Sequence, residues 1–339
     1  MRIAKLSIFC AGVALAAAVA AEPSFVPVLK TNFPDAFVLQ HGGEFLAYST
    51  NDGANVPVAM SRNLTDWTVL AHPADPKRKY DAMPHLGAWA KEGFTWAPEV
   101  LELNGKYLLY YTASARHENS QCVGVAVAAD PKGPFVDSNA GPIVCQTKLG
   151  GTIDASPFKD ADGSLYLYFK NDGNRVHERT SLWGQRLAPD GLSAVGEPQE
   201  LLKDNERWED RVIEAPTMVR APAGYDLFYS GGFFGWNPEE GGLSPYAMGY
   251  ANCTSPLGPC TPSKANPLLH SFNDRDAGCL SGPGHQSIFS AAGHMFISFH
   301  AWAATSACRK APDDARYLYI APLFWKNGEP VLGPSLRPH

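Results

Sequence analysis

The stretch Gly151-Thr152-Ile153-Asp154-Ala155-Ser156-Pro157-Phe158 places one acidic residue at the start of a short apolar segment. Four other segments of the 339-residue chain follow the same plan. Their first residues, here called heads, are Asp35, Ala97, Glu214 and His285, which with Asp154 gives intervals of 62, 57, 60 and 71 residues. A turn and a second apolar run follow each head, and the turns carry similarly spaced glycines: Gly43, Gly105, Gly163, Gly224 and Gly293. Two landmarks that drift together indicate an internal repeat of about sixty residues in five copies.

Each repeat contains segments with the length and alternation of short β-strands. In the first repeat, four strands are predicted at residues 36–39, 45–50, 56–61 and 67–70. The segment 71–93 lacks periodicity and is expected to be a long loop, and the last repeat is expected to end near residue 323. Five four-stranded units without helical crossovers predict an all-β fold, a five-bladed β-propeller, as a single domain over residues 22–339. A β-sandwich is the alternative, but sandwiches do not repeat at sixty residues.

The first 21 residues have the composition of a secretory signal peptide. Arg2 and Lys5 precede an apolar run at residues 6–21, which is too short for a membrane span and ends in small residues. A short membrane anchor is the alternative. We expect cleavage near Ala20 or Ala21, so the mature protein would be secreted to the extracellular space or the periplasm.

Six cysteines follow that segment, an even number that suggests disulfides in an exported chain. Their order along the chain predicts the pairs Cys122–Cys145, Cys253–Cys260 and Cys279–Cys308, although other connectivities and free buried thiols are possible. The formal net charge is −6 and there is no basic run, which argues against nucleic acid as a partner.

In a propeller the first strand of every blade lines the central channel, so the heads converge on one pocket. This arrangement would bring Asp35, Asp154, Glu214 and His285 together. Three carboxylates in one pocket repel one another, which is costly unless the chemistry uses them. One ionised acid can activate water, a second can donate a proton to a leaving group, and a third can tune the second. These are the requirements for glycoside hydrolysis with inversion.

Two other acids compete for these roles. Most Asp and Glu side chains are solvated or cap turns, so the shared position at the strand heads carries the argument, not the residue type. Glu99 lies two residues beyond a head, and Glu209 lies in the acidic approach to the fourth repeat. Both are expected to be structural.

Five motifs resemble those of glycoside hydrolase family 43, and together they cover essentially the whole mature chain. They are Asn-Phe-Pro-Asp at 32–35, Thr-Trp-Ala-Pro-Glu-Val at 95–100, Ile-Asp-Ala-Ser-Pro-Phe at 153–158, Ile-Glu-Ala-Pro-Thr-Met at 213–218 and Gly-Pro-Gly-His-Gln-Ser at 282–287. The resemblance implies a five-bladed propeller that cleaves plant cell-wall pentosides with inversion. It also implies that Asp35 is the general base, Glu214 the general acid, and Asp154 the residue that tunes and orients the acid. The family usually has proline directly after the base, whereas here Pro34 precedes Asp35 and Ala36 follows it.

Aromatic and basic residues near these motifs are predicted to bind the sugar. Trp96 would form a wall against the apolar face of a sugar, or else pack in the core. Arg316 begins the third strand of the fifth repeat, where similar family members carry an arginine that contacts the sugar in the cleaved position; a surface salt bridge is the alternative. Phe233, Phe234 and Trp236 form an aromatic loop that would line the pocket mouth or pack the rim.

His285 has two interpretations. It is either a core histidine hydrogen-bonded near the channel axis or, by resemblance to arabinan-cleaving members, a ligand of a hydrated calcium in the channel. It would also contact the substrate. Calcium prefers oxygen ligands, so a single histidine is weak support for a structural Ca²⁺. No cofactor is expected to be required.

These observations predict a secreted inverting glycosidase, with α-L-arabinofuranosidase activity releasing arabinose from arabinan or arabinoxylan as the first choice. β-Xylosidase and endo-1,5-α-L-arabinanase are alternatives, because loops at the propeller mouth decide between exo and endo action. A non-catalytic sugar-binding propeller is an alternative of another class, and the three strand-head carboxylates argue against it. The expected partner is an oligo- or polysaccharide, with no nucleic acid, no membrane and a monomeric state.

Overall fold

The structure is a computed structural model of the chain and describes residues 25–236, 242–274 and 277–338. The predicted signal peptide at residues 1–21 lies outside these ranges. Among the described residues, no helix is long and apolar enough to cross a membrane. The only helices described are the short 3-10 turns η1 (Thr147–Leu149), η2 (Gly173–Val176) and η3 (Arg207–Glu209).

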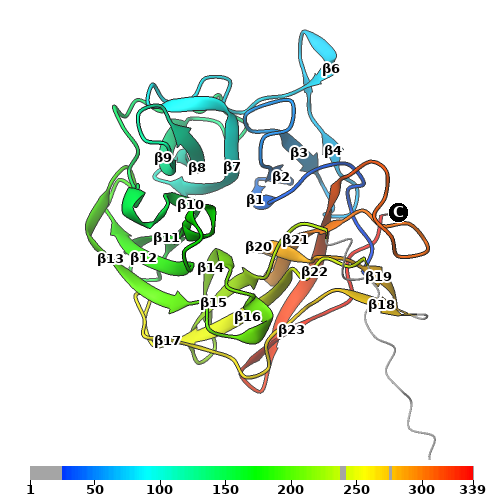
Figure 1. Cartoon of the computed structure of the whole chain (residues 1–339). Coiled ribbons are helices and arrows are strands. Elements are labelled where there is room, and N and C mark those ends of the chain that lie inside the picture. Colours follow the sequence, from blue (N-terminus) through cyan, green and yellow to red (C-terminus); the bar gives the residue numbers. More distant parts are fainter. Residues whose placement is uncertain (1–24, 237–241, 275–276, 339) are drawn as a thin grey trace, which may run out of the picture.

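Five antiparallel sheets stand around a central axis, so the predicted five-bladed β-propeller is confirmed (Figure 1). Blade 1 is β1 (Phe37–His41), β2 (Glu44–Tyr48), β3 (Val58–Ser61) and β4 (Thr68–Val69). Blade 2 is β7 (Ala90–Leu103), β8 (Lys106–Ala115) and β9 (Gln121–Ala128). Blade 3 is β10 (Thr152–Lys159), β11 (Leu165–Asn171), β12 (Ser181–Leu187) and β13 (Ala194–Lys203). Blade 4 is β14 (Ile213–Ala221), β15 (Gly224–Gly231), β16 (Ala247–Cys253) and β17 (Cys260–Pro262), and blade 5 is β20 (Gly284–Ala291), β21 (His294–Trp302), β22 (Arg316–Lys326) and β23 (Glu329–Leu332).

The first two strands of each blade are joined by the glycine turns that mark the repeat. Asn104 and Gly105 connect β7 to β8 with φ values of 52° and 73°. Ala292 and Gly293 connect β20 to β21 with φ values of 49° and 81°. Two consecutive residues with positive φ give the tight turn whose twist matches that of the strands, which explains the regular spacing of these glycines.

The core consists of five apolar clusters, each filling the gap between two neighbouring blades. Tyr48 and Tyr111, for example, meet between blades 1 and 2, and Phe33 and Leu318 meet between blades 1 and 5. Each blade is therefore buried on both faces by its neighbours, and no blade can bury its apolar residues alone. The cluster between blades 5 and 1 closes the ring.

The N-terminal segment completes this closure. Val28 donates its backbone N–H to the carbonyl of Leu318 in β22, and Phe33 donates to the carbonyl of Arg316. Phe25 packs edge-on against Phe299 of β21. The residues before β1 thus lie along the last blade, next to the part of β22 that β23 leaves unpaired.

Three parts of the fold differ from the expectation. Blade 2 has three strands among the described residues, because Val136 and Val144 form only isolated bridges to β9 and three nearby prolines supply no ladder N–H. The expected loop 71–93 contains a hairpin of β5 (Ala71–His72) and β6 (Asp75–Lys79), whose charged sequence has no alternation to reveal it. A hairpin of β18 (Phe272–Asp274) and β19 (Gly278–Leu280) precedes blade 5, and β23 extends that blade beyond residue 323.

All three predicted disulfide pairs are present. Cys122–Cys145 ties the segment after blade 2 to β9, and Cys253–Cys260 joins β16 to β17. Cys279–Cys308 links β19 to the loop between β21 and β22.

Candidate active site

The first strand of every blade begins at a residue with a left-handed backbone. The φ values are 57° at Asp35, 43° at Ala97, 59° at Asp154, 53° at Ala215 and 51° at His285. In blades 2 to 5 the pairing with the second strand shifts register across this residue, which marks a β-bulge. A bulge redirects a side chain at a strand end, and a positive φ outside glycine costs about 1–2 kcal/mol. Five such residues around one axis mark a functional site.

The head of blade 4 is Ala215, so the placement of Glu214 at that position was wrong by one residue. Glu214 pairs with Ser230 across the sheet. In blade 2 it is Trp96, the residue before the head, that makes the corresponding pair, with Thr112. Glu214 therefore reaches the pocket from the position before the bulge, whereas Asp35 and Asp154 reach it from the bulge itself.

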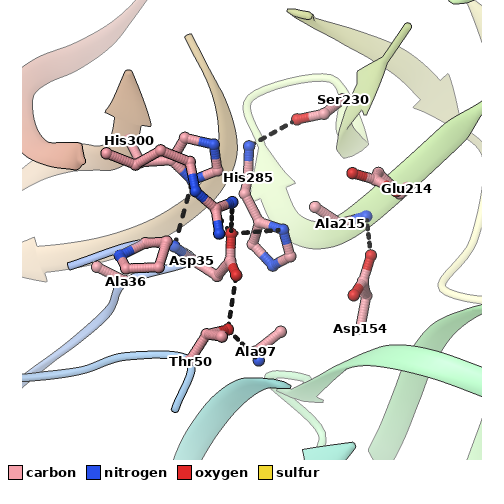
Figure 2. Close-up of polar contacts among 12 residues, drawn as sticks. Asp35, Ala36, Thr50, Ala97, Asp154, Glu214, Ala215, Ser230, His285 and His300 are labelled. Atoms are coloured by element: carbon pink, nitrogen blue, oxygen red, sulfur yellow. Dashed lines mark hydrogen bonds and ion pairs between the residues drawn. The ribbon is translucent and has the colours of Figure 1, made fainter. Parts of the chain in front are cut away.

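Four head amides donate to a side chain of the preceding blade, as Figure 2 shows for Ala97 and His285. The bonds are Ala97 N to Thr50 Oγ1 (2.9 Å), Asp154 N to Thr112 Oγ1 (3.2 Å), His285 N to Ser230 Oγ (2.8 Å) and Asp35 N to His300 Nδ1 (3.2 Å). Each acceptor lies on a second strand, opposite the residue that precedes the head of its own blade. We call these places the acceptor positions; the fifth, in blade 3, is held by Lys170, which pairs with Ile153.

Lys170 has no lone pair to offer when charged, and the remaining head amide finds another partner. Ala215 donates its N–H to Oδ2 of Asp154 at 2.9 Å (Figure 2). Asp154 is thereby tied to the residue next to Glu214.

A cavity of about 470 Å³ opens where the heads converge. Asp35, Asp154 and Glu214 all line it, so the structure brings the three predicted carboxylates together. Of the predicted sugar-binding residues, Trp96, Arg316 and His285 line the cavity too. In the aromatic loop it is Phe234 that lines the cavity, whereas Phe233 and Trp236 lie outside its lining.

Asp35 is surrounded by groups that favour its ionised form. Nη1 of Arg316 lies 3.0 Å from Oδ1, Nδ1 of His285 lies 3.4 Å from the same oxygen, and the hydroxyl of Thr50 donates to Oδ2 at 2.6 Å. Burial raises the pKa of Asp35, but Arg316, His285 and His300 more than offset it and hold the pKa well below its usual value. This carboxyl is an anion at any pH near neutrality.

Arg316 is itself held between two aromatic rings. Its guanidinium carbon lies 5.3 Å from the ring centre of Phe234 and 5.8 Å from that of Trp302. The indole N–H of Trp302 donates to the carbonyl of Phe234, which ties the aromatic loop of blade 4 to blade 5. Because Arg316 points at Asp35 within the cavity, it is not part of a surface salt bridge.

Glu214 has one donor on each carboxyl oxygen. Nζ of Lys170 lies 2.8 Å from Oε2, and the hydroxyl of Tyr246 lies 2.6 Å from Oε1. Burial raises the pKa of Glu214, but Lys170 and Tyr246 outweigh it, so the pKa is lowered.

Asp154 has the opposite balance. Burial raises its pKa to about 6, and the charge of Glu214 adds to the increase, while His285 and Lys170 oppose it. Oxygen or nitrogen atoms of Asp154, Glu214 and His285 all lie within 4.8 Å of one another. The two acids therefore share one proton in mildly acidic solution, and without substrate that proton resides on Asp154.

This cluster was tested as a calcium site. Both oxygens of Glu214 already accept hydrogen bonds, one of them from a fully buried ammonium, and Asp154 accepts the amide of Ala215. A cation placed among these groups would face Lys170 at close range. The two carboxylates therefore do not fit a divalent ion, and only His285 remains as a candidate ligand.

The competing acids do not line the cavity. Glu209 is buried and accepts the amides of Asn205 and Glu206 as well as the hydroxyl of Tyr229, so it caps η3. Burial and the charge of Asp154 raise the pKa of Glu99 to about 8.

Four residues of the site were missed from the sequence, namely Thr50, Lys170, Tyr246 and His300. Thr50, Lys170 and His300 occupy acceptor positions, which an alignment of the five second strands would have revealed. Tyr246 lies just before β16, outside the head motifs, and nothing in the sequence distinguishes it from a core tyrosine.

Relatives of known activity share this chain's sequence at low identity. The extracellular endo-α-(1→5)-L-arabinanase 2 of Bacillus subtilis (strain 168) is 26% identical over 72% of this chain and 53% of its own length. The extracellular exo-α-(1→5)-L-arabinofuranosidase ArbA of Cellvibrio japonicus (strain Ueda107) is 25% identical over 87% of this chain and 84% of its own length. The chain thus spans about half the length of the first relative.

A solved structure and a family model agree with these relatives. The crystal structure of a thermostable family-43 glycoside hydrolase superimposes with a TM-score of 0.75 at 26% identity, covering 94% of this chain and 97% of that one. The sequence model of Glycosyl hydrolases family 43 matches residues 26–330, and the chain therefore belongs to glycosyl hydrolases family 43.

Proposed function

We propose that this protein is an inverting glycoside hydrolase that releases α-L-arabinofuranosyl units from arabinan or arabinoxylan. One observation carries the proposal. The cavity holds an acid that is kept ionised, Asp35, and a second pair of acids, Asp154 and Glu214, that shares a proton.

Asp35 acts as the general base. Its carboxylate takes a proton from a water molecule, whose oxygen forms the new bond to the anomeric carbon. Arg316, His285 and Thr50 fix the carboxylate and keep it anionic before the water is bound. Trp96 and Phe234 supply the apolar walls for the sugar ring.

Glu214 acts as the general acid. As the glycosidic bond breaks, its proton passes to the departing oxygen, and Glu214 becomes a carboxylate. Asp154 supplies the proton that Glu214 needs at the start of the next cycle and, once ionised, raises the affinity of Glu214 for it. This role corresponds to the tuning function inferred for Asp154 from the sequence.

The choice of substrate rests on the relatives, both of which are named for α-(1→5)-L-arabinan linkages, one endo-acting and one exo-acting. A β-xylosidase and an endo-1,5-α-L-arabinanase are the competing activities. A screen with an aryl α-L-arabinofuranoside, an aryl β-xyloside and linear arabinan separates the three. Cleavage of none of them, together with sugar binding, would instead identify a non-catalytic propeller lectin.

The roles of the two acids are tested with leaving groups of different quality. We expect Glu214→Ala to lower kcat on arabino-oligosaccharides by about 10³-fold, because their alkoxide leaving groups need a proton. A substrate with a good aryloxide leaving group should be affected far less. Asp35→Ala should affect both substrates alike, since water must be activated whatever departs. If Asp35→Ala were the variant rescued by the better leaving group, the two roles would be reversed.

Secretion and metal content remain proposals. The three disulfides and the extracellular location in the names of both relatives support export of this chain. The reaction above needs no cofactor. Calcium at His285 and the monomeric state stay predictions, to be checked by metal analysis of the purified protein and by light scattering.

A further inference from the structure

Lys170 is the exception among five equivalent residues. The acceptor positions of the other four blades hold Thr50, Thr112, Ser230 and His300, each of which accepts a head amide. Two of these are threonines, so a small neutral hydroxyl is sufficient to join neighbouring blades at this place. The fold alone does not call for a lysine in blade 3.

The position of Lys170 is costly for a cation. Its side chain is 0% exposed, and an ammonium removed from water is destabilising unless it is paired. Its partner is Oε2 of Glu214 at 2.8 Å, and Lys170 also lines the cavity. The charge is thus placed against one particular carboxyl of the pocket.

Lys170 also changes what Asp154 does. Since Lys170 cannot accept the amide of Ala215, Oδ2 of Asp154 accepts it instead. This bond holds Asp154 beside Glu214. A neutral acceptor at residue 170 would compete for that amide and release Asp154.

We propose that Lys170 is a positioning residue for acid catalysis, which holds Glu214 toward the pocket and stabilises the negative charge that develops on it. This inference rests on the proposed function. When the proton of Glu214 moves to the departing oxygen, the carboxylate left behind meets an ammonium on Oε2 and the hydroxyl of Tyr246 on Oε1. Both donors are in place before the reaction, so little reorganisation is needed as charge appears.

Lys170→Thr is the first test, because it installs the side chain found at the acceptor positions of blades 1 and 2. It is expected to fold and to lose at least about 10²-fold in kcat on arabino-oligosaccharides. The loss on an aryloxide substrate should be at least tenfold smaller, on the order of the leaving-group difference for Glu214 itself. A wild-type rate on the natural substrate, or equal losses on both substrates, would overturn the inference.

Lys170→Met gives a readout that a structural role would not move. Removing the cation beside Glu214 raises the pKa of that acid, so the basic limb of the pH–rate profile should shift to higher pH. A variant whose rate falls by the same factor at every pH would contradict the proposal. Lys132→Met is the matched control, since Lys132 pairs with Glu44 at 3.1 Å outside the cavity, and it should leave the profile unchanged.

A double-variant cycle keeps the test decisive if a single variant folds poorly. In a Glu214→Gln background, Lys170→Met should change the residual rate on the aryloxide substrate by no more than about twofold, because Lys170 acts through Glu214. A larger additional loss would show that Lys170 has another role. Failure of the wild type on every pentoside would refute the proposed function, whereas an active wild type with an insensitive Lys170 would refute this inference alone.

Discussion

Asp35 and Asp154 hold the same place in their blades and have opposite electrostatic surroundings. Asp35 faces a guanidinium and two imidazoles, so its pKa lies well below the usual value. Asp154 is buried beside another carboxyl, so its pKa is raised to about 6. Equivalent residues thus acquire different chemistry from the side chains that neighbouring blades supply, which the residue type alone does not reveal.

Asp154 should destabilise the protein at alkaline pH. A carboxyl whose folded pKa is raised contributes stability below its unfolded pKa, near 3.8, and loses it as the pH rises through about 6. We therefore expect Asp154→Asn to increase the free energy of unfolding at pH 8 by up to about 3 kcal/mol. Denaturant titrations at pH 8 and pH 4 measure this, and the gain should disappear at the lower pH.

The same measurement on Asp35→Asn serves as the contrast. The lowered pKa of Asp35 contributes stability above about pH 3.8 and loses it as the pH falls through its folded pKa. This variant should therefore be less stable than the wild type at pH 8, because Arg316 loses its partner. An Asp154→Asn variant that behaved the same way would show that its charged form is favoured.

At the scale of single strands, Gly284 shows how closely the start of β20 approaches its neighbour. A Cβ added at Gly284 would overlap the ring of Tyr246, whose hydroxyl donates to Glu214. We expect Gly284→Ala to displace that ring, to cost about 1–3 kcal/mol in stability, and to lower kcat on arabino-oligosaccharides. Thermal unfolding and steady-state kinetics measure both effects.

Gly43→Ala is the control for this prediction, because a Cβ at Gly43 meets nothing within 4 Å. It should leave both quantities unchanged. A Gly284→Ala variant with full activity would mean that the bond from Tyr246 to Glu214 is dispensable.

The strand heads were predictable from the sequence in four of five blades. In the fourth, the presence of an acid at Glu214 drew the alignment one residue away from Ala215. The turn glycines contained the correct answer, since Gly163, Gly224 and Gly293 are 61 and 69 residues apart, and Asp154, Ala215 and His285 are 61 and 70 apart. Spacing was the better guide there than residue type.

Other features left no readable pattern. Lys170 ends the apolar run of a second strand, and its importance appears only when it is compared with the acceptor positions of the other blades. The hairpin of β5 and β6 is charged and exposed, so burial imposes no alternation on it. Pairing partners between blades depend on the closed ring, which no local segment specifies.

For the whole molecule, ring closure depends on the segment before β1. Phe25 and Val28 are buried, and burying two such side chains contributes about 4 kcal/mol. We expect a chain that lacks residues 25–32 to unfold about 6 °C lower, given the unfolding entropy of a domain of this size. Calorimetry measures the shift, and a chain truncated after Leu336 is the control, which should unfold at nearly the wild-type temperature.

The closure also determines when the enzyme can first work. Asp35 and Arg316 are separated by 281 residues in the sequence, and His300 by 265, so the base meets its partners only when the last blade docks on the first. Contacts this distant form late and slowly in folding. During synthesis, a ribosome would have to release almost the entire chain before the base could be held as an anion. Hydrolytic competence would then arise at the final step of assembly, and a nascent or partly folded chain would be inert toward sugars.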